Sequence, residues 1–186
     1  NYLLVCGTAS KRTHDQIERV LKTYSYGTIT LAPSLLADKS KRESLLLEVP
    51  RACSMLGKDN LIVRIAAPEF SVGGDDTPSG PWTGKQIVRG LGFFVSSVLR
   101  KTRPASVFLT GGDTANAVLK AIDAKGIRLG GEIVSGMAYG MLMGGSIDRL
   151  PITTKAGAFG KRDTLVALHE YWENQRLPDK YRTNRD

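Results

Sequence analysis

Residues 107–119 carry the clearest structural pattern in the chain, and they read Val-Phe-Leu-Thr-Gly-Gly-Asp-Thr-Ala-Asn-Ala-Val-Leu. The first three residues form an apolar run with the β-branched and aromatic content of a buried strand. Gly111 and Gly112 break this run, and apolar residues then recur at the spacing of an amphipathic helix. A strand, a glycine turn and a helix start leave backbone N–H groups and the positive helix end facing one point. This stretch therefore predicts a site for an anion, most often a phosphate.

The two side chains that follow the glycines add chemistry to this turn. Thr114 offers a hydroxyl group, and Asp113 offers a carboxylate to Mg²⁺ or to a ligand hydroxyl. Asp113 is equally typical of a helix N-cap, and the local sequence does not separate the two interpretations.

The N-terminal segment repeats the order of strand, turn and helix. Residues 2–6 form an apolar run, and Gly-Thr-Ala-Ser at residues 7–10 is the turn that leaves it. Thr13 and Gln16 then match the capping-box pattern, which predicts a helix that starts here and extends to about Tyr24. This turn brings a second set of small, hydroxyl-bearing residues to a helix start.

A third unit of the same kind lies near the other end of the chain. Residues 151–155 are typical of a strand, residues 155–160 of a glycine turn and residues 163–172 of a helix. Lys155 could place a point charge on a phosphate, although an exposed lysine at a strand end is the commoner interpretation. Ligands of open α/β sheets bind at the carboxyl edge, where the three turns should gather. The pattern therefore predicts a phosphate-bearing ligand held by backbone amides.

The remaining segments complete an alternation of strands and helices. Further strands are predicted at residues 28–31, at 61–66 and within 127–134, and further helices at residues 41–56, interrupted at Pro50, and 85–101. The helix after the central glycines is expected to end near Gly126, and residues 135–140 are expected to form a loop. Residues 71–84 are a long Gly/Pro-rich loop, and residues 174–186 are a basic tail. The alternation predicts a single α/β domain in three layers, with helices on both faces of a mostly parallel sheet.

Composition narrows the class of protein. The 186 residues, of which 41% are hydrophobic, suffice for one full core, and no apolar run approaches a membrane span. Cys6 and Cys53 lie in apolar company and are expected to be reduced, and no apolar leader is expected, so a cytoplasmic setting is predicted. The net charge of +8 is scattered along the chain, which favours a solvated basic surface over a nucleic-acid interface.

Four motifs in this order resemble the four-carbon acid sugar kinase family, and more narrowly its C-terminal nucleotide-binding domain. They are Gly-Thr-Ala-Ser at 7–10, Thr-Gly-Gly-Asp-Thr-Ala at 110–115, Gly-Met-Ala-Tyr-Gly at 136–140 and Thr-Lys-Ala-Gly-Ala-Phe-Gly at 154–160. The resemblance implies an ATP-dependent kinase, working with Mg²⁺, that phosphorylates threonate, erythronate or 3-oxo-tetronate. Some members of the family also carry the name Hrp-dependent type III effector.

The resemblance also implies a set of nucleotide contacts in this chain. The set consists of Ser10, Gly111, Gly112, Asp113, Thr114 and Gly157. In this scheme the glycines let backbone amides approach the nucleotide, and the two hydroxyl groups donate to it. Asp113 is the candidate catalytic residue and the candidate Mg²⁺ ligand, since no separate metal motif is present. Gly136, Met137 and Lys155 are secondary candidates.

The sequence departs from the family at two of these motifs. The first turn commonly reads Gly-Ser-Cys-Ser and the last Lys-Ser-Gly or Lys-Pro-Gly, so Ala9 replaces a thiol and Ala156 replaces a hydroxyl or a proline. Complete enzymes of the family also have an N-terminal domain that binds the sugar acid. The resemblance thus implies that residues 1–186 are the ATP-binding C-terminal domain of a two-domain kinase, with little turnover alone, and it accommodates a homo-oligomer. The alternative is a non-catalytic binding or effector protein that keeps the fold.

Overall fold

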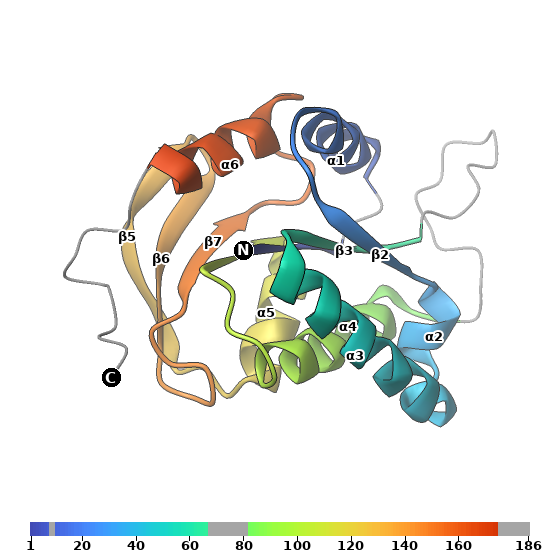
Figure 1. Cartoon of the computed structure of the whole chain (residues 1–186). Coiled ribbons are helices and arrows are strands. Elements are labelled where there is room, and N and C mark those ends of the chain that lie inside the picture. Colours follow the sequence, from blue (N-terminus) through green and yellow to red (C-terminus); the bar gives the residue numbers. More distant parts are fainter. Residues whose placement is uncertain (8–9, 67–81, 175–186) are drawn as a thin grey trace.

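A seven-stranded sheet runs through the computed structural model, which describes residues 1–7, 10–66 and 82–174 (Figure 1). The strands are β1 (Tyr2–Cys6), β2 (Gly27–Leu31), β3 (Leu61–Ile65), β4 (Ser106–Thr110), β5 (Gly126–Val134), β6 (Met137–Met143) and β7 (Pro151–Lys155). Neighbouring strands in the order β2-β3-β1-β4-β7 are parallel, and β6 and β5 follow them with antiparallel pairing. The predicted mostly parallel sheet is confirmed.

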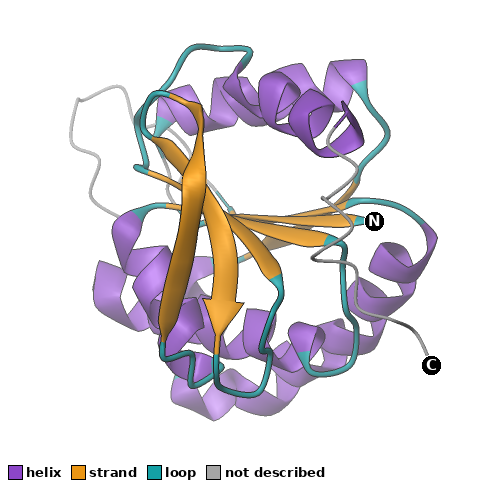
Figure 2. Cartoon of the chain, turned by 90° about the vertical axis from the view of Figure 1, so that its left-hand side faces the viewer, coloured by secondary structure: helices purple, strands orange, loops and turns teal. Residues whose placement is uncertain are grey.

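Helices cover both faces of this sheet, as Figure 2 shows. Helices α1 (Lys11–Thr23) and α6 (Thr164–Asn174) pack on one face. The other face carries α2 (Pro33–Ala37), α3 (Arg42–Lys58), α4 (Gly84–Leu99) and α5 (Gly112–Ala121), with a short 3-10 turn η1 (Lys39–Lys41) before α3. Helix α3 continues through Pro50 and does not restart there. The three-layer, single-domain α/β prediction is confirmed.

The two faces of the sheet bury two separate apolar clusters. Successive residues of a strand point to opposite faces, so Leu3 packs with α4 and Leu4 packs with α1 and α6. In β4, Phe108 and Leu109 divide in the same way. Because β1 and β4 are covered on both sides, they appear in the sequence as continuous apolar runs. Polar chemistry is therefore confined to the ends of these central strands.

The strand order positions the candidate site. Strands β1 and β4 are parallel neighbours, yet the helices that follow them, α1 and α5, pack on opposite faces of the sheet. In open α/β sheets, ligands bind outside the carboxyl ends of the strands at such a reversal. The predicted turns after β1 and β4 both lie at this point.

The start of α1 differs from the prediction. The N-cap is Ser10, whose side chain accepts a hydrogen bond from the backbone N–H of Thr13, and the helix begins at Lys11. The predicted capping box at Thr13 and Gln16 is wrong, because both residues lie inside the helix and are buried. Ser10 is an equally good N-cap three residues earlier, which leaves the side chains of Thr13 and Gln16 to make contacts elsewhere in the fold.

Two predictions in the last third of the chain are also wrong. Most of residues 135–140, expected to be a loop, belongs to β6, which starts at Met137 and pairs with both β5 and β7. Gly140 serves close strand packing, since a Cβ there would overlap the carbonyl oxygen of Arg128. Gly126 begins β5, whereas α5 ends at Ala121 and the chain turns through Asp123 with a φ of 56°.

The remaining predictions concern the two cysteines, the long loop, the basic tail and membrane spans. Both cysteines are free: Cys6 is buried and Cys53 is half-buried. Residues 71–81 of the predicted loop and 175–186 of the predicted tail lie outside the described residues. None of the helices in the described ranges combines the length and the apolar character that crossing a membrane requires.

Candidate functional site

The carboxyl ends of the central strands place a row of side chains on one face of the sheet. In register, Arg64 of β3 lies opposite Cys6 of β1, Cys6 opposite Thr110 of β4, and Thr110 opposite Lys155 of β7. Residues in register point to the same face, and Cys6 belongs to the cluster under α1 and α6. Cys6, Thr110 and Lys155 are all buried, so this row lies beneath α1.

Lys155 is held by carbonyl groups of the turn that follows it. Its Nζ donates hydrogen bonds to the carbonyl oxygens of Ala156 (3.0 Å), Gly157 (2.8 Å) and Phe159 (2.9 Å). Burial lowers the pKa of Lys155 to about 8, with Cys6 acting to raise it and Arg12 to lower it. The expectation of an exposed lysine at the strand end is wrong, because the side chain turns inward under the glycine turn.

Hydrogen bonds join the three predicted turns to one another. The N–H of Gly111 donates to the carbonyl of Lys155 at 2.9 Å. The Thr13 hydroxyl donates to the carbonyl of Gly157 at 2.9 Å, and the Ser10 hydroxyl donates to Thr13 Oγ1 at 3.0 Å. The turns that carry Ser10, Gly111 and Gly157 are therefore neighbours at the carboxyl edge, as the sequence predicts.

Gly7 and Thr114 bring the first two turns into direct contact. A Cβ at Gly7 would overlap the Thr114 side chain, so only glycine allows this approach without a shift. Thr114 is buried, and its Oγ1 also lies 3.4 Å from the position of a Cβ at Gly111. The Thr114 hydroxyl thus lies between the turn after β1 and the turn after β4.

The start of α5 is the exposed part of the site. Gly111 is the N-cap with a φ of 96°, a conformation that favours glycine. Gly112 and Asp113 are exposed, and a Cβ at Gly112 would meet no atom within 4 Å. The interpretation of Asp113 as the N-cap is wrong, since it lies in the first turn of the helix. The helix dipole favours a negative charge at this position, whether from a side chain or from a ligand.

The two secondary candidates from the hairpin play different parts. Gly136, with a φ of 77°, forms the turn between β5 and β6, and a Cβ there would lie 2.5 Å from the Phe159 ring. Met137 is fully buried and lies opposite Lys155 in the sheet. Gly136 therefore leaves room for the Phe159 ring of the last glycine turn, and Met137 belongs to the core.

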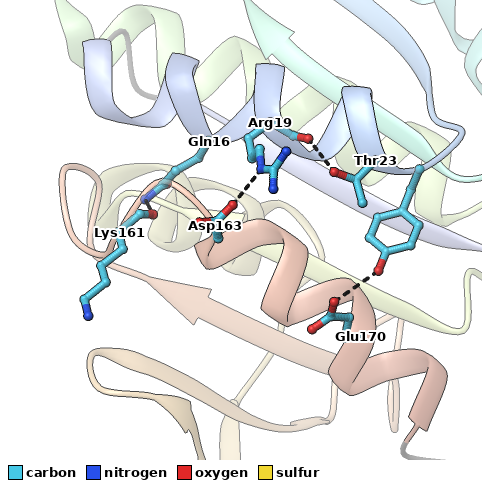
Figure 3. A network of polar contacts seen from close by, with 7 residues as sticks. Gln16, Arg19, Thr23, Lys161, Asp163 and Glu170 are labelled. Carbon is cyan, nitrogen blue, oxygen red and sulfur yellow. Dashed lines mark hydrogen bonds and ion pairs between the residues drawn. The ribbon is translucent and has the colours of Figure 1, made fainter.

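Helix α1 is also tied to the segment that follows the last glycine turn (Figure 3). The side chain of Gln16 donates from Nε2 to the carbonyl oxygens of Phe159 (3.1 Å) and Lys161 (2.9 Å). The Arg19 guanidinium pairs with Asp163 at 2.6 Å. These contacts fix the last turn against α1.

A cationic cleft of about 500 Å³ lies beside these contacts. It is lined by Lys11, Arg12, Asp15, Gly160, Lys161 and Arg162. Asp15, its acidic residue, pairs with Lys11 at 3.3 Å. The excess of positive charge attracts anionic ligands toward this edge. The sequence does not reveal the cleft, because its two halves lie far apart in the chain.

Comparison with known proteins identifies the family of this chain. The family model of the nucleotide-binding C-terminal domain matches residues 3–165. The chain is 38% identical over 143 residues to a D-threonate kinase from Bordetella bronchiseptica, covering 75% of this chain and 33% of that protein. It is 27% identical over 184 residues to a D-threonate kinase from Salmonella typhimurium, covering 95% and 44%. A D-erythronate kinase from Heliobacterium modesticaldum is 33% identical over 88 residues, covering 46% and 20%. The chain thus spans less than half the length of these relatives.

Solved structures share the fold. A protein from Bordetella bronchiseptica, a domain of unknown function crystallised with citrate as a domain-swapped dimer, has a TM-score of 0.78 at 28% identity. The match covers 95% of this chain and 42% of that one. A protein from Haemophilus influenzae has a TM-score of 0.65 at 17% identity, covering 95% and 40%.

Proposed function

Because this chain belongs to the nucleotide-binding C-terminal domain family, we propose that it binds ATP with Mg²⁺ for a sugar-acid kinase. The proposed substrate class is a four-carbon sugar acid of the threonate or erythronate type, because the curated relatives are D-threonate and D-erythronate kinases. Since the chain covers 33% and 44% of the two D-threonate kinases, we assign binding of the sugar acid to a further domain.

One observation carries the nucleotide-binding proposal, namely the hydrogen-bonded gathering of three turns at one sheet edge. The turns after β1, β4 and β7 are linked through Thr13, Gly111 and Lys155. The exposed start of α5 adds backbone N–H groups and a positive helix end. Phosphoryl transfer depends on positioning and on neutralising phosphate charge, which is what such an edge provides.

Each candidate residue takes a definite part in this proposal. Gly111 and Gly112 let the phosphates approach the backbone of α5. Ser10 and Thr114 shape the turns, since the Ser10 hydroxyl caps α1 and the Thr114 hydroxyl lies between two turns. Asp113 is the proposed Mg²⁺ contact. Mg²⁺ in kinase sites is held by one or two carboxylates together with substrate phosphates, and it would neutralise phosphate charge here.

The proposal predicts binding without turnover for this chain alone. Isothermal titration with Mg-ATP should give saturable binding to one site. A coupled assay with D-threonate or D-erythronate should show turnover only when a sugar-acid-binding domain is also present. Failure of ATP, ADP and AMP to bind would favour the alternative of a non-catalytic protein. Full turnover by this chain alone would contradict the assignment of the sugar acid to another domain.

A further inference from the structure

We infer that Lys155 is a positioning residue, which turns the backbone amides of the last glycine turn outward toward a phosphate. The identity of the anion as a nucleotide phosphate rests on the proposed function. The arrangement of the turn itself does not.

Lys155 sets the directions of three peptide groups in the turn that follows it. Nζ of Lys155 donates hydrogen bonds to the carbonyl oxygens of Ala156, Gly157 and Phe159 at 2.8–3.0 Å. In a trans peptide plane the C=O and the N–H point in opposite directions. The N–H groups of those three planes belong to Gly157, Ala158 and Gly160, so they point away from the ammonium.

Because Lys155 is buried, N–H groups that point away from it point toward the outside of the molecule. Lys155 is only 4% exposed, whereas Ala156 and Ala158 above it are exposed. The N–H of Phe159 is taken up within the turn by the carbonyl of Ala156 at 3.2 Å. Outward N–H groups in neighbouring planes of a tight turn form the kind of concavity that binds anions.

Helix α1 holds the same carbonyls from the same side. The Thr13 hydroxyl donates to the carbonyl of Gly157, and the Gln16 amide donates to that of Phe159. A carbonyl oxygen has two lone pairs, so each of these oxygens accepts one bond from Lys155 and one from α1. Lys155 is the charged member of this set, and it is the one that reaches all three planes.

The charge on Lys155 is sensitive to pH in an accessible range. Burial lowers its pKa to about 8, and the charged neighbour is Arg12 of α1, which lowers it further. The Cys6 thiol of β1 would raise the pKa of Lys155 only when it is ionised, and burial raises the pKa of this thiol to about 12, so it is neutral at pH 8. Thr110 of β4 and Met137 of β6 carry no charge. Raising the pH through 8 therefore removes one donor and the positive charge from beneath the turn.

Loss of this proton has opposite effects on binding and on folding. Phosphate binding should weaken, because the turn loses the charge that orders it. Folding should gain, because a lysine with a lowered pKa costs stability while it is charged, and the unfolded chain retains its proton above pH 8. If Lys155 served stability alone, raising the pH would not lower phosphate affinity while folding stability rises.

The test compares Lys155→Met with Lys161→Met, which removes an exposed lysine of the cationic cleft. In the full chain, Lys155→Met should weaken Mg-ATP binding by about tenfold or more, the scale of a lost charge-assisted hydrogen bond, and Lys161→Met by much less. Between about pH 7.5 and about pH 9.5 the affinity of the wild type for Mg-ATP should fall severalfold. Over the same range the contribution of Lys155 to the free energy of unfolding should not fall. The affinity of Lys155→Met for Mg-ATP should not show this fall with pH.

Chymotrypsin provides a readout that needs no nucleotide, because Phe159 is exposed in the turn. Cleavage after Phe159 should be faster in Lys155→Met than in the wild type or in Lys161→Met. Wild-type affinity and cleavage in Lys155→Met would overturn the inference. If the wild type binds no Mg-ATP, the proposed function fails and the cleavage rates alone decide the role of Lys155. If Lys155→Met does not fold, the pH profile of the wild type decides it.

Discussion

The Gly112→Val variant is expected to lose its stabilisation by Mg-ATP and to keep the unfolding temperature of the ligand-free wild type. Gly112 is the first residue of α5 and is exposed, and a side chain there would meet no protein atom within 4 Å. The fold therefore tolerates valine. The isopropyl group would stand over the N–H groups of the helix start, where the phosphates are proposed to bind.

Thermal unfolding with increasing Mg-ATP measures this effect. A ligand at 100 times its dissociation constant stabilises a protein by about 2.7 kcal/mol, and the variant should lose essentially all of it. Gly57→Val is the matched control, since a side chain at Gly57 also meets nothing within 4 Å. Gly57 lies at the end of α3, which leads into the amino end of β3, away from the site. Unchanged stabilisation of Gly112→Val by Mg-ATP would remove α5 from the nucleotide site.

The second large effect is expected from Gly90→Ala, in the middle of α4. A Cβ at Gly90 would overlap the carbonyl oxygen of Leu36 and lie 2.8 Å from its Cα. These are backbone atoms of α2, so no change of rotamer relieves the overlap and the two helices must separate. Overpacking of this kind costs about 1–3 kcal/mol or more, which exceeds the helix propensity that alanine gains.

Urea unfolding of Gly90→Ala and Gly57→Ala separates packing from propensity. Gly90→Ala should unfold at a lower midpoint with an unchanged slope. Gly57→Ala, also inside a helix but in open space, should be stabilised by about 0.4–1 kcal/mol. If both variants were stabilised, α4 would not approach α2 as closely as the structure has it.

The elements that the sequence predicts correctly are those that have a clear local pattern. Strands β1, β4 and β7 are short apolar or β-branched runs bounded by turn residues, and their bounds agree with the prediction to within a residue. The order of strand, turn and helix repeats three times and makes the parallel sheet the expected outcome. The gathering of the three turns follows from this topology alone.

The errors arise where a distant segment decides the local structure. Met137 and Gly140 look like loop residues in sequence, but pairing of β6 with β5 and β7 makes them part of a strand. Gln16 looks like half of a capping box, yet its side chain bonds to carbonyls at Phe159 and Lys161, across most of the chain. Local propensity cannot anticipate such partners.

The same limit applies to the candidate site. The glycines at 111 and 112 could be found from the sequence, because a turn between a strand and a helix has a recognisable pattern. Lys155 can be singled out in the sequence, but its position at a strand end predicts exposure. Its burial depends on three carbonyl partners that only the folded turn provides. The contact between Gly7 and Thr114 has no local signal beyond a glycine directly after a strand.

Backbone hydrogen exchange of the full chain, measured with and without Mg-ATP, shows whether nucleotide binds at the carboxyl edge of the sheet. We predict that Mg-ATP slows exchange together in three segments that are distant in sequence, residues 10–16, 111–115 and 157–160. Exchange near Gly57, at the other edge of the sheet, should not change. Exchange that is unaltered in all three segments at a saturating nucleotide concentration would contradict a nucleotide site at this edge.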